Sequence, residues 1–223
     1  PTFAGDTLRH HYAAAQWYVQ AGGLVFVPIF YFQLPMLGEM FYVWALLLGN
    51  DTIGTIVNAS FGVAAALALY AGARQYLARP AALLAAILFY TLPGSWDYNY
   101  AGMPDLGLLL YVLLSVFLFR VWCARGRWQD LLLAGLCAGF AASVKIIGLY
   151  AVFALGLLLL WRLARARQFA ARQRMGLLLI FGAGLVVSGA PWYVHNWLSA
   201  GNPVWPVFYP WLGGRCWNAT AYA

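Results

Sequence analysis

Residues 105–161, DLGLLLYVLLSVFLFRVWCARGRWQDLLLAGLCAGFAASVKIIGLYAVFALGLLLLW, decide the fold class of this chain. The stretch contains three apolar runs, which are separated by arginines around residue 125 and by a polar break at Lys145 and Gly148. Each run approaches the length of about 20 residues that a helix needs to cross a bilayer. The stretch therefore predicts consecutive transmembrane helices.

The composition of the whole chain agrees with a membrane protein. Of the 223 residues, 64% are apolar and only 9% are charged, and the mean hydropathy is +0.74. Soluble domains are about half apolar and roughly a quarter charged. So little charge cannot cover a surface that faces water, which excludes a soluble enzyme, and it equally excludes a disordered chain. The three cysteines have neither CxxC nor metal-ligand spacing, so we expect no disulfide framework.

Further apolar runs of similar length lie on both sides of residues 105–161. Six candidate transmembrane helices result, at residues 53–73, 81–96, 105–122, 130–146, 147–161 and 175–194. The expected fold class is therefore all-α, a polytopic transmembrane helix bundle of about six spans, with interfacial helices in the first outer loop.

Basic residues predict how the bundle is oriented. Ten of the thirteen lysines and arginines lie in three short clusters, at residues 74–79, 120–127 and 162–174. Each cluster separates two apolar runs, which is typical of cytoplasmic loops. Five of the six acidic residues and all three histidines then fall on the outer side. We attribute the net charge of +7 to this orientation and expect no nucleic acid partner, because the basic residues do not share one surface with aromatic or polar partners.

The first fifty residues contain no predicted span. Residues 7–20 have the composition of a helix that lies in the membrane interface, and residues 36–49, with Glu39 among them, are too few to cross. No signal peptide precedes Pro1, so we expect a portion of a longer polytopic protein. The expected organisation is a periplasmic loop with interfacial helices at 1–50, a transmembrane bundle at 51–194, and a periplasmic segment rich in aromatic residues and proline at 195–223.

Candidate site residues begin near the start of the chain. Asp6, Arg9 and His10 have the i, i+3, i+4 spacing that brings side chains together on a helix. A carboxylate beside an imidazole can act as a general base, and an arginine can hold a phosphate. Asp6 is equally suited to cap the helix that follows, and this alternative stays open.

Four further charged residues are candidates for binding a substrate: Glu39, Asp97, Asp105 and Lys145. Lys145 lies in an otherwise apolar stretch, which indicates either an anionic partner or a side chain that extends to the headgroups. Asp105, at the outer start of an apolar run, is either a site residue or a helix cap. Asp97 lies in an aromatic loop that suits sugar stacking as well as the membrane interface. Glu39 either pairs with Arg9 or lines a site.

Six short stretches carry a family resemblance through their order and their place on the outer side. They are residues 6–11 (DTLRHH), 34–39 (LPMLGE), 104–105 (PD), 143–145 (SVK), 191–197 (PWYVHNW) and 201–206 (GNPVWP). This set resembles the GT-C superfamily of polytopic glycosyltransferases, in the bacterial branch similar to protein O-mannosyltransferases and the aminoarabinose transferase of lipid A.

The resemblance implies an inverting glycosyltransferase of the bacterial inner membrane, which takes a sugar from a polyprenyl-phosphate donor and passes it to an acceptor on the periplasmic face. It implies Asp6 as the catalytic residue with Arg9 beside it, Asp105 as the acid of the second outer loop, and Lys145 near the donor phosphate. Thr7 stands where many members have a second acid, so a divalent metal is left open. We expect no other cofactor, and we expect the donor and the lipid bilayer as partners.

A hypothesis of a different class remains beside the enzyme. The chain could be a non-catalytic subunit that packs against other membrane subunits of a larger complex. A transporter is less well supported, because the sequence has neither repeated halves nor charges near mid-membrane. The sequence also lacks GxGxxG, Walker, HExxH and GxSxG motifs, so nucleotide-driven transport and the familiar hydrolase mechanisms have no support.

Overall fold

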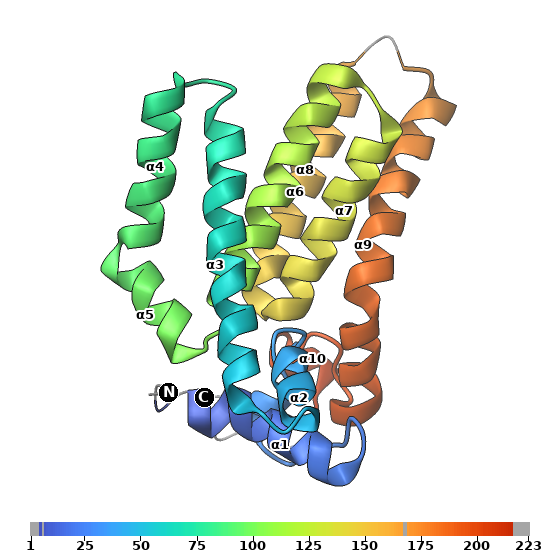
Figure 1. Cartoon of the computed structure of the whole chain (residues 1–223). Helices are drawn as coiled ribbons and strands as arrows, with labels where there is room; N and C mark the ends of the chain where they lie inside the picture. Colours follow the sequence, from blue (N-terminus) through green and yellow to red (C-terminus); the bar gives the residue numbers. More distant parts are fainter. Residues whose placement is uncertain (1–4, 6, 167–168, 216–223) are drawn as a thin grey trace.

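The computed structural model describes residue 5, residues 7–166 and residues 169–215, and this part of the chain is helical without a strand (Figure 1). The α-helices are α1 (Tyr12–Ala21), α2 (Met40–Leu47), α3 (Asp51–Ala73), α4 (Arg79–Thr91), α5 (Pro93–Ala101), α6 (Asp105–Arg125), α7 (Trp128–Val144), α8 (Leu149–Arg165), α9 (Ala171–Ala200) and α10 (Tyr209–Leu212). A π-helical turn (Thr7–His11) and two 3-10 turns (Phe30–Gln33 and Ile146–Gly148) complete the described elements.

Four helices in the described part of the chain are long and apolar enough to cross a membrane. They are Thr52–Ala73, Asp105–Arg125, Ile146–Arg165 and Ala171–Ala200. The shorter apolar helices α4 and α7 stand beside them, so an apolar helix occupies each of the six places expected from the sequence. The protein is therefore a multi-pass helical membrane protein, as predicted.

The second predicted transmembrane helix, residues 81–96, is divided into two helices in the structure. α4 ends at Thr91 and α5 begins at Pro93, with Leu92 between them in an extended conformation (φ −57°, ψ 136°). Proline disfavours the helical conformation in the residue that precedes it and has no N–H to continue the helix. A single straight span at this place was therefore a wrong prediction, and α5 turns away along the end of the bundle (Figure 1).

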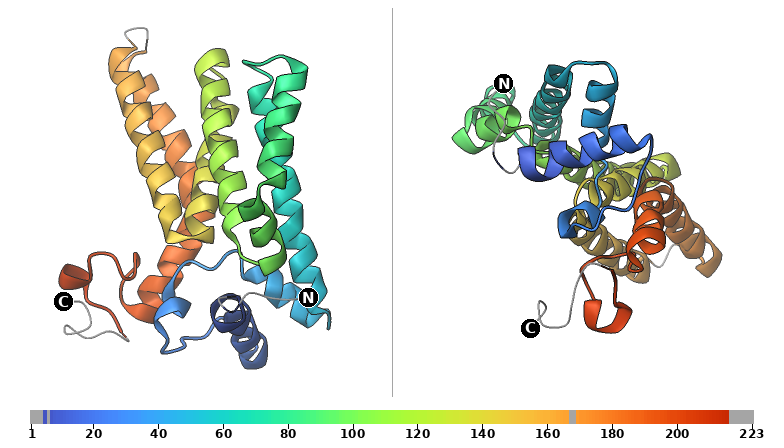
Figure 2. Two further views of the ribbon diagram at one scale, coloured as in Figure 1. Left: turned by 90° about the vertical axis from the view of Figure 1, so that its left-hand side faces the viewer. Right: turned by 90° about the horizontal axis from the view of Figure 1, so that it is seen from below.

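The two ends of the bundle differ in their chemistry. The connections from α3 to α4, from α6 to α7 and from α8 to α9 lie at the same end, shown at the top of Figure 1, and the arginine clusters lie in or next to them. α1 and α2 lie at the opposite end, together with the junction between α7 and α8 (Figures 1 and 2). The polar candidates that lie within the described residues therefore share one end of the molecule.

Helix α7 is fixed against α9 through small residues. A Cβ on Gly135 would lie 2.3 Å from the carbonyl oxygen of Phe181, and one on Gly139 would lie 2.6 Å from that of Leu185. The Ser188 hydroxyl of α9 donates a hydrogen bond of 2.8 Å to a carbonyl of α7. Such close backbone approach is how small residues hold membrane helices together. The C-terminal end of α7 therefore has a fixed position in the bundle.

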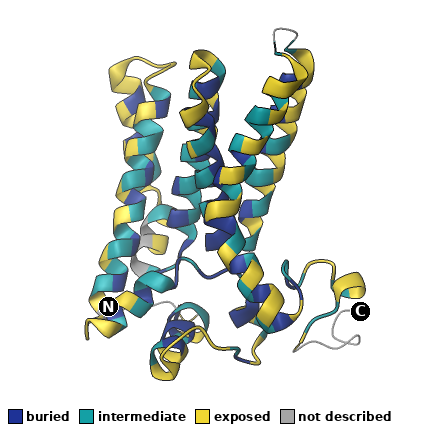
Figure 3. Cartoon of the chain, turned by 90° about the vertical axis from the view of Figure 1, so that its right-hand side faces the viewer, coloured by how far each residue is buried: buried dark blue, intermediate teal, exposed yellow. Residues whose placement is uncertain are grey.

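Exposed residues cover the outside of the bundle (Figure 3), and many of them have large apolar side chains. Ile56, Phe153, Leu179 and Val187 are all more than 60% exposed, and they come from three different helices. A soluble protein rarely exposes so large an apolar surface, whereas hydrocarbon tails solvate it. This surface is the one that faces lipid.

A layer of short helices and turns lies under the outer end of the bundle, and α1 runs across it when seen from below (Figure 2). α2 has eight residues, about 12 Å of helix at 1.5 Å per residue, which is far short of a bilayer core. The chain from Tyr12 to Gly38 contains no Asp, Glu, Lys or Arg. This segment therefore docks by apolar packing and neutral hydrogen bonds, and not through ion pairs.

Candidate active site

The backbone at the end of α7 places the Lys145 side chain. α7 ends at Val144, and Lys145 is extended (φ −148°, ψ 145°) before the 3-10 turn that leads into α8. The turn is tight, because a Cβ on Gly148 would lie 2.3 Å from the carbonyl carbon of Ala141. The polar break that the sequence indicated is therefore a real interruption of the helix, and Lys145 lies at this interruption.

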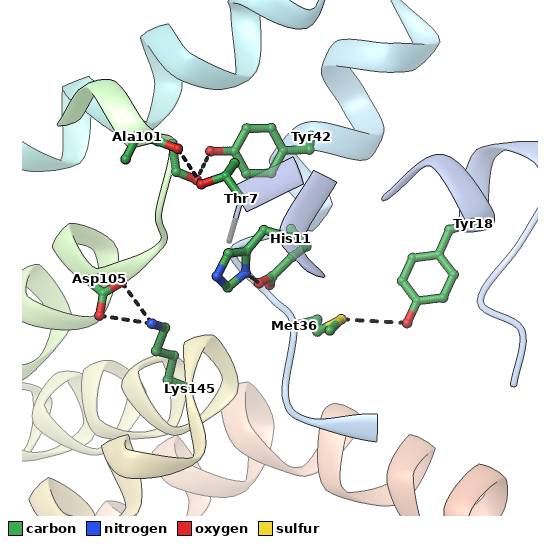
Figure 4. A network of polar contacts seen from close by, with 10 residues as sticks. Thr7, His11, Tyr18, Met36, Tyr42, Ala101, Asp105 and Lys145 are labelled. Atoms are coloured by element: carbon green, nitrogen blue, oxygen red, sulfur yellow. Dashed lines mark hydrogen bonds and ion pairs between the residues drawn. The ribbon is translucent and has the colours of Figure 1, made fainter. Parts of the chain in front are cut away.

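Lys145 and Asp105 form an ion pair (Figure 4). The Lys145 Nζ atom donates to both carboxylate oxygens, at 2.9 Å to Oδ1 and 2.8 Å to Oδ2. The two side chains are 28% and 26% exposed, so water screens this contact only partly. Lys145 thus has an anionic partner within the protein. Asp105 is the first residue of α6, and Pro104 occupies the cap position, so the helix-cap interpretation of Asp105 was wrong.

Glu39 is the most buried acid of the described residues, with 2% of its surface exposed. Its Oε1 atom pairs with Nδ1 of His11, and not with Arg9, whose side chain is exposed. Within the described residues, the Oε2 atom has no hydrogen-bond partner. A buried carboxylate needs a compensating group, and His11 supplies it as a hydrogen-bond donor.

Two tyrosines lie near Glu39, and one of them, Tyr42, connects the first loop to the segment before α6. Burial, with Glu39 as a second cause, raises the pKa of Tyr18 to about 12 and also raises the pKa of Tyr42. Both phenols therefore remain protonated donors at neutral pH. The Tyr42 hydroxyl donates to the carbonyl of Gly102, and that of Tyr18 lies 3.9 Å from the sulfur of Met36 (Figure 4).

Two further contacts bind the first loop to the bundle. The Thr7 hydroxyl is fully buried and donates to the carbonyl of Ala101, just before α6. The backbone N–H of Leu37 donates a 3.0 Å bond to the carbonyl of Ser143 at the end of α7. Residues 7–11, 34–39, 104–105 and 143–145, which belong to four of the stretches that carried the resemblance, thus meet at one place.

A cavity of about 230 Å³ lies at this meeting point, between the first loop and the junction of α7 and α8. The side chains that give its lining a polar character are His10, His11, Tyr31, Glu39 and Lys145. A larger hollow of about 390 Å³ between α3 and α4 is almost entirely apolar and opens on the lipid-facing surface. A concave site with a few convergent polar groups is the usual form of a small-molecule site, so the first cavity is the candidate active site.

The other predicted residues lie outside this lining. Asp97 is exposed on α5 and does not contribute to the cavity. Arg9 lies on the neighbouring π-helical turn and is exposed. Asp6, the predicted catalytic residue, lies outside the described residues. Within the described part of the chain, no group of three or more His, Cys, Asp or Glu side chains converges to hold a metal ion.

His11 and Tyr31 were not predicted from the sequence as site residues. The sequence contained one signal for His11. No Lys or Arg lies between Tyr12 and Gly38, so the histidines just before this segment are the nearest basic residues in the sequence that could pair with Glu39. Tyr31 gave a weaker signal, since aromatic residues are common at membrane interfaces.

The comparisons with known proteins agree with this helical membrane fold and its polar cavity. The chain matches the sequence model of the dolichyl-phosphate-mannose-protein mannosyltransferase family over residues 35–194, which is well over half of its length. It belongs to this family and is a membrane glycosyltransferase, as the resemblance implied. The matched range includes Glu39, Asp105 and Lys145 and begins after Asp6. A comparison with curated protein sequences gives no match.

Proposed function

We propose that the protein transfers a sugar from a polyprenyl-phosphate donor to an acceptor at the periplasmic face of the bacterial inner membrane. The observation that carries this proposal is the cavity at the end of α7, where Lys145 and Glu39 lie next to apolar residues at the edge of a membrane bundle. A polyprenyl-phosphate sugar has the matching parts: a lipid tail, an anionic phosphate, and a ring with hydroxyl groups.

The orientation of the bundle supports the periplasmic face. The three arginine clusters lie at the end opposite to the cavity, and arginine-rich loops remain in the cytoplasm. A donor whose tail lies in the outer leaflet then presents its phosphate and sugar at the level of the cavity.

Lys145 is suited to bind the donor phosphate. An ammonium group has three N–H donors, and Asp105 accepts two of them. The third can reach a phosphate oxygen, while Asp105 keeps the side chain extended and in place. Negative charge develops on the phosphate when it leaves, and a cation placed beforehand stabilises that charge without reorganising.

The transfer itself needs a base for the acceptor. In this proposal the Asp6 carboxylate takes the proton of the acceptor hydroxyl, whose oxygen attacks the anomeric carbon. The bond from that carbon to the phosphate oxygen breaks, and the polyprenyl phosphate leaves with the bonding electrons. Attack from the opposite face inverts the configuration. Thr7, which follows Asp6 in the sequence, is anchored by its hydrogen bond to the carbonyl of Ala101.

The test is a transfer assay with protein reconstituted in lipid, a radiolabelled polyprenyl-phosphate sugar and a membrane extract that supplies acceptors. We expect transfer by the wild type and none by Asp6→Asn, which removes the negative charge and hardly changes the size of the side chain. Equal chromatographic profiles of the two proteins serve as the folding control. Substantial activity in Asp6→Asn would rule out the assignment of the base, and no turnover of any donor by the wild type would contradict the function.

A further inference from the structure

One wall of the cavity has no role in the phosphate and proton chemistry described above. Tyr31 lines the cavity, and 47% of its surface is exposed. Its ring packs against His10, with ring centroids 4.1 Å apart and planes tilted by 46°. The ring of Phe30 meets it at 84° with centroids 5.1 Å apart. Tyr31 is thus an exposed aromatic ring that neighbouring rings hold in a defined orientation.

The turn that carries Tyr31 is equally well fixed. Gln33 is buried and donates from Nε2 to the carbonyl of Val27 at 2.6 Å, which closes the loop before the turn. The backbone N–H of Leu34 donates to the Tyr31 carbonyl at 3.3 Å. The indole N–H of Trp205, from the far end of the chain, donates to the carbonyl of Phe30 at 3.3 Å. A ring on such a turn loses little further freedom when a ligand packs against it.

We propose that Tyr31 is the stacking platform for the donor sugar. This inference rests on the proposed function and names the residue that binds the ring. A sugar has hydroxyl groups around its rim and a face of C–H groups, and the electron-rich face of an aromatic ring attracts such C–H groups. The cavity supplies both kinds of contact, with Tyr31 for the face, the imidazoles of His10 and His11 as polar groups for the rim, and the ammonium of Lys145 for the phosphate.

The size of the cavity fits a small occupant. Pockets for drug-sized ligands span about 300–1,000 Å³, and this cavity of about 230 Å³ lies below that range. The space therefore suits one sugar ring on the platform. The competing interpretation of Tyr31 is an interfacial aromatic residue that only anchors the loop in the membrane, and the two make different predictions for ligand binding.

The experiment measures binding of two ligands to the reconstituted protein: a polyprenyl-phosphate sugar and the same polyprenyl phosphate without the sugar. Tyr31→Leu removes the aromatic face, Tyr31→Phe keeps it, and Tyr150→Leu is the matched control. Tyr150 lies at the start of α8 near the cavity, is 78% exposed and is not among the lining residues.

A stacking platform predicts that Tyr31→Leu binds the sugar-bearing lipid about tenfold more weakly. It also predicts unchanged binding of the sugar-free lipid, and wild-type values for Tyr31→Phe and Tyr150→Leu with both ligands. Equal losses for both ligands, or none, would overturn the platform while the proposed function stands. If the wild type bound neither ligand, the proposed function itself would fail, and the platform with it.

Discussion

The Asp105 carboxylate accepts two hydrogen bonds from the Lys145 ammonium, at 2.8 and 2.9 Å, and so joins the first turn of α6 to the junction between α7 and α8. The first helical turn favours a negative charge, which the peptide dipoles stabilise. Asp105 therefore holds the lysine in place, and Lys145 in turn defines the cationic side of the cavity.

Replacing Lys145 by glutamine should weaken donor binding. A charge-assisted hydrogen bond contributes about 1.5–3 kcal/mol, so we expect the KM for the donor to rise roughly ten- to a hundredfold. The measurement is transfer kinetics at varied donor concentration. Arg215→Gln is the control, because it removes an exposed positive charge at the same end from a residue outside the cavity lining. An equal rise in both variants would indicate a general effect of surface charge and contradict a specific role of Lys145.

Replacing His11 by alanine should destabilise the protein through Glu39. The substitution leaves a buried carboxylate without its partner, which costs about 3–5 kcal/mol in comparable buried pairs. Adding Glu39→Gln to His11→Ala removes the buried charge, so the double variant should unfold at a higher temperature than His11→Ala alone. Thermal unfolding in detergent gives both values. A double variant less stable than the single one would show that the charge of Glu39 is not what His11 compensates.

The packing of α7 on α9 makes Gly139 sensitive to a single methyl group. Its Cβ would lie 2.1 Å from the Ser188 hydroxyl and 2.6 Å from a backbone carbonyl, so Gly139→Ala should force the helices apart and cost about 1–3 kcal/mol. Gly156 on α8 has no atom within 4 Å of its Cβ position, and Gly156→Ala should instead raise the melting temperature slightly, because alanine is the better helix former. Equal effects of the two changes would contradict the close approach.

Tyr18 should make the stability of the protein fall at high pH. The ordinary pKa of a tyrosine is 10.0, and burial raises the pKa of Tyr18 to about 12 in the folded protein, so the folded state keeps a proton that the unfolded state loses. The stabilisation is complete below pH 10 and decreases as the pH rises towards 12. Tyr18→Phe removes this contribution. The unfolding free energy of the variant should therefore fall less steeply than that of the wild type between pH 10 and pH 12. Parallel pH profiles for the wild type and Tyr18→Phe would contradict the pKa shift.

The places of the apolar helices follow from the sequence, since apolar runs and arginine clusters are local signals. The interruption at Lys145 was predicted for the same reason, because a polar break separates two apolar runs there. The sequence also contained a signal for the division of residues 81–96, because Pro93 lies within that run and a proline ends or kinks a helix.

The pairings within the candidate site did not follow from the sequence. Asp105 and Lys145 were each candidates, but 40 residues separate them, and only the packing of α6 beside α7 brings them together. Glu39 meets His11 across 28 residues, because α1 folds back over α2. Pairing of this kind depends on tertiary packing, which periodicity and spacing do not encode.

The uncharged segment from Tyr12 to Gly38 has a consequence for how ionic strength acts on the site. Added salt screens charges and leaves apolar contacts and neutral hydrogen bonds in place. The walls that this segment contributes, with Tyr31 and Leu37 among their anchoring residues, therefore keep their geometry in concentrated salt. The proposed attraction between Lys145 and the donor phosphate should weaken under the same conditions, so we expect salt to reduce affinity without loosening the scaffold.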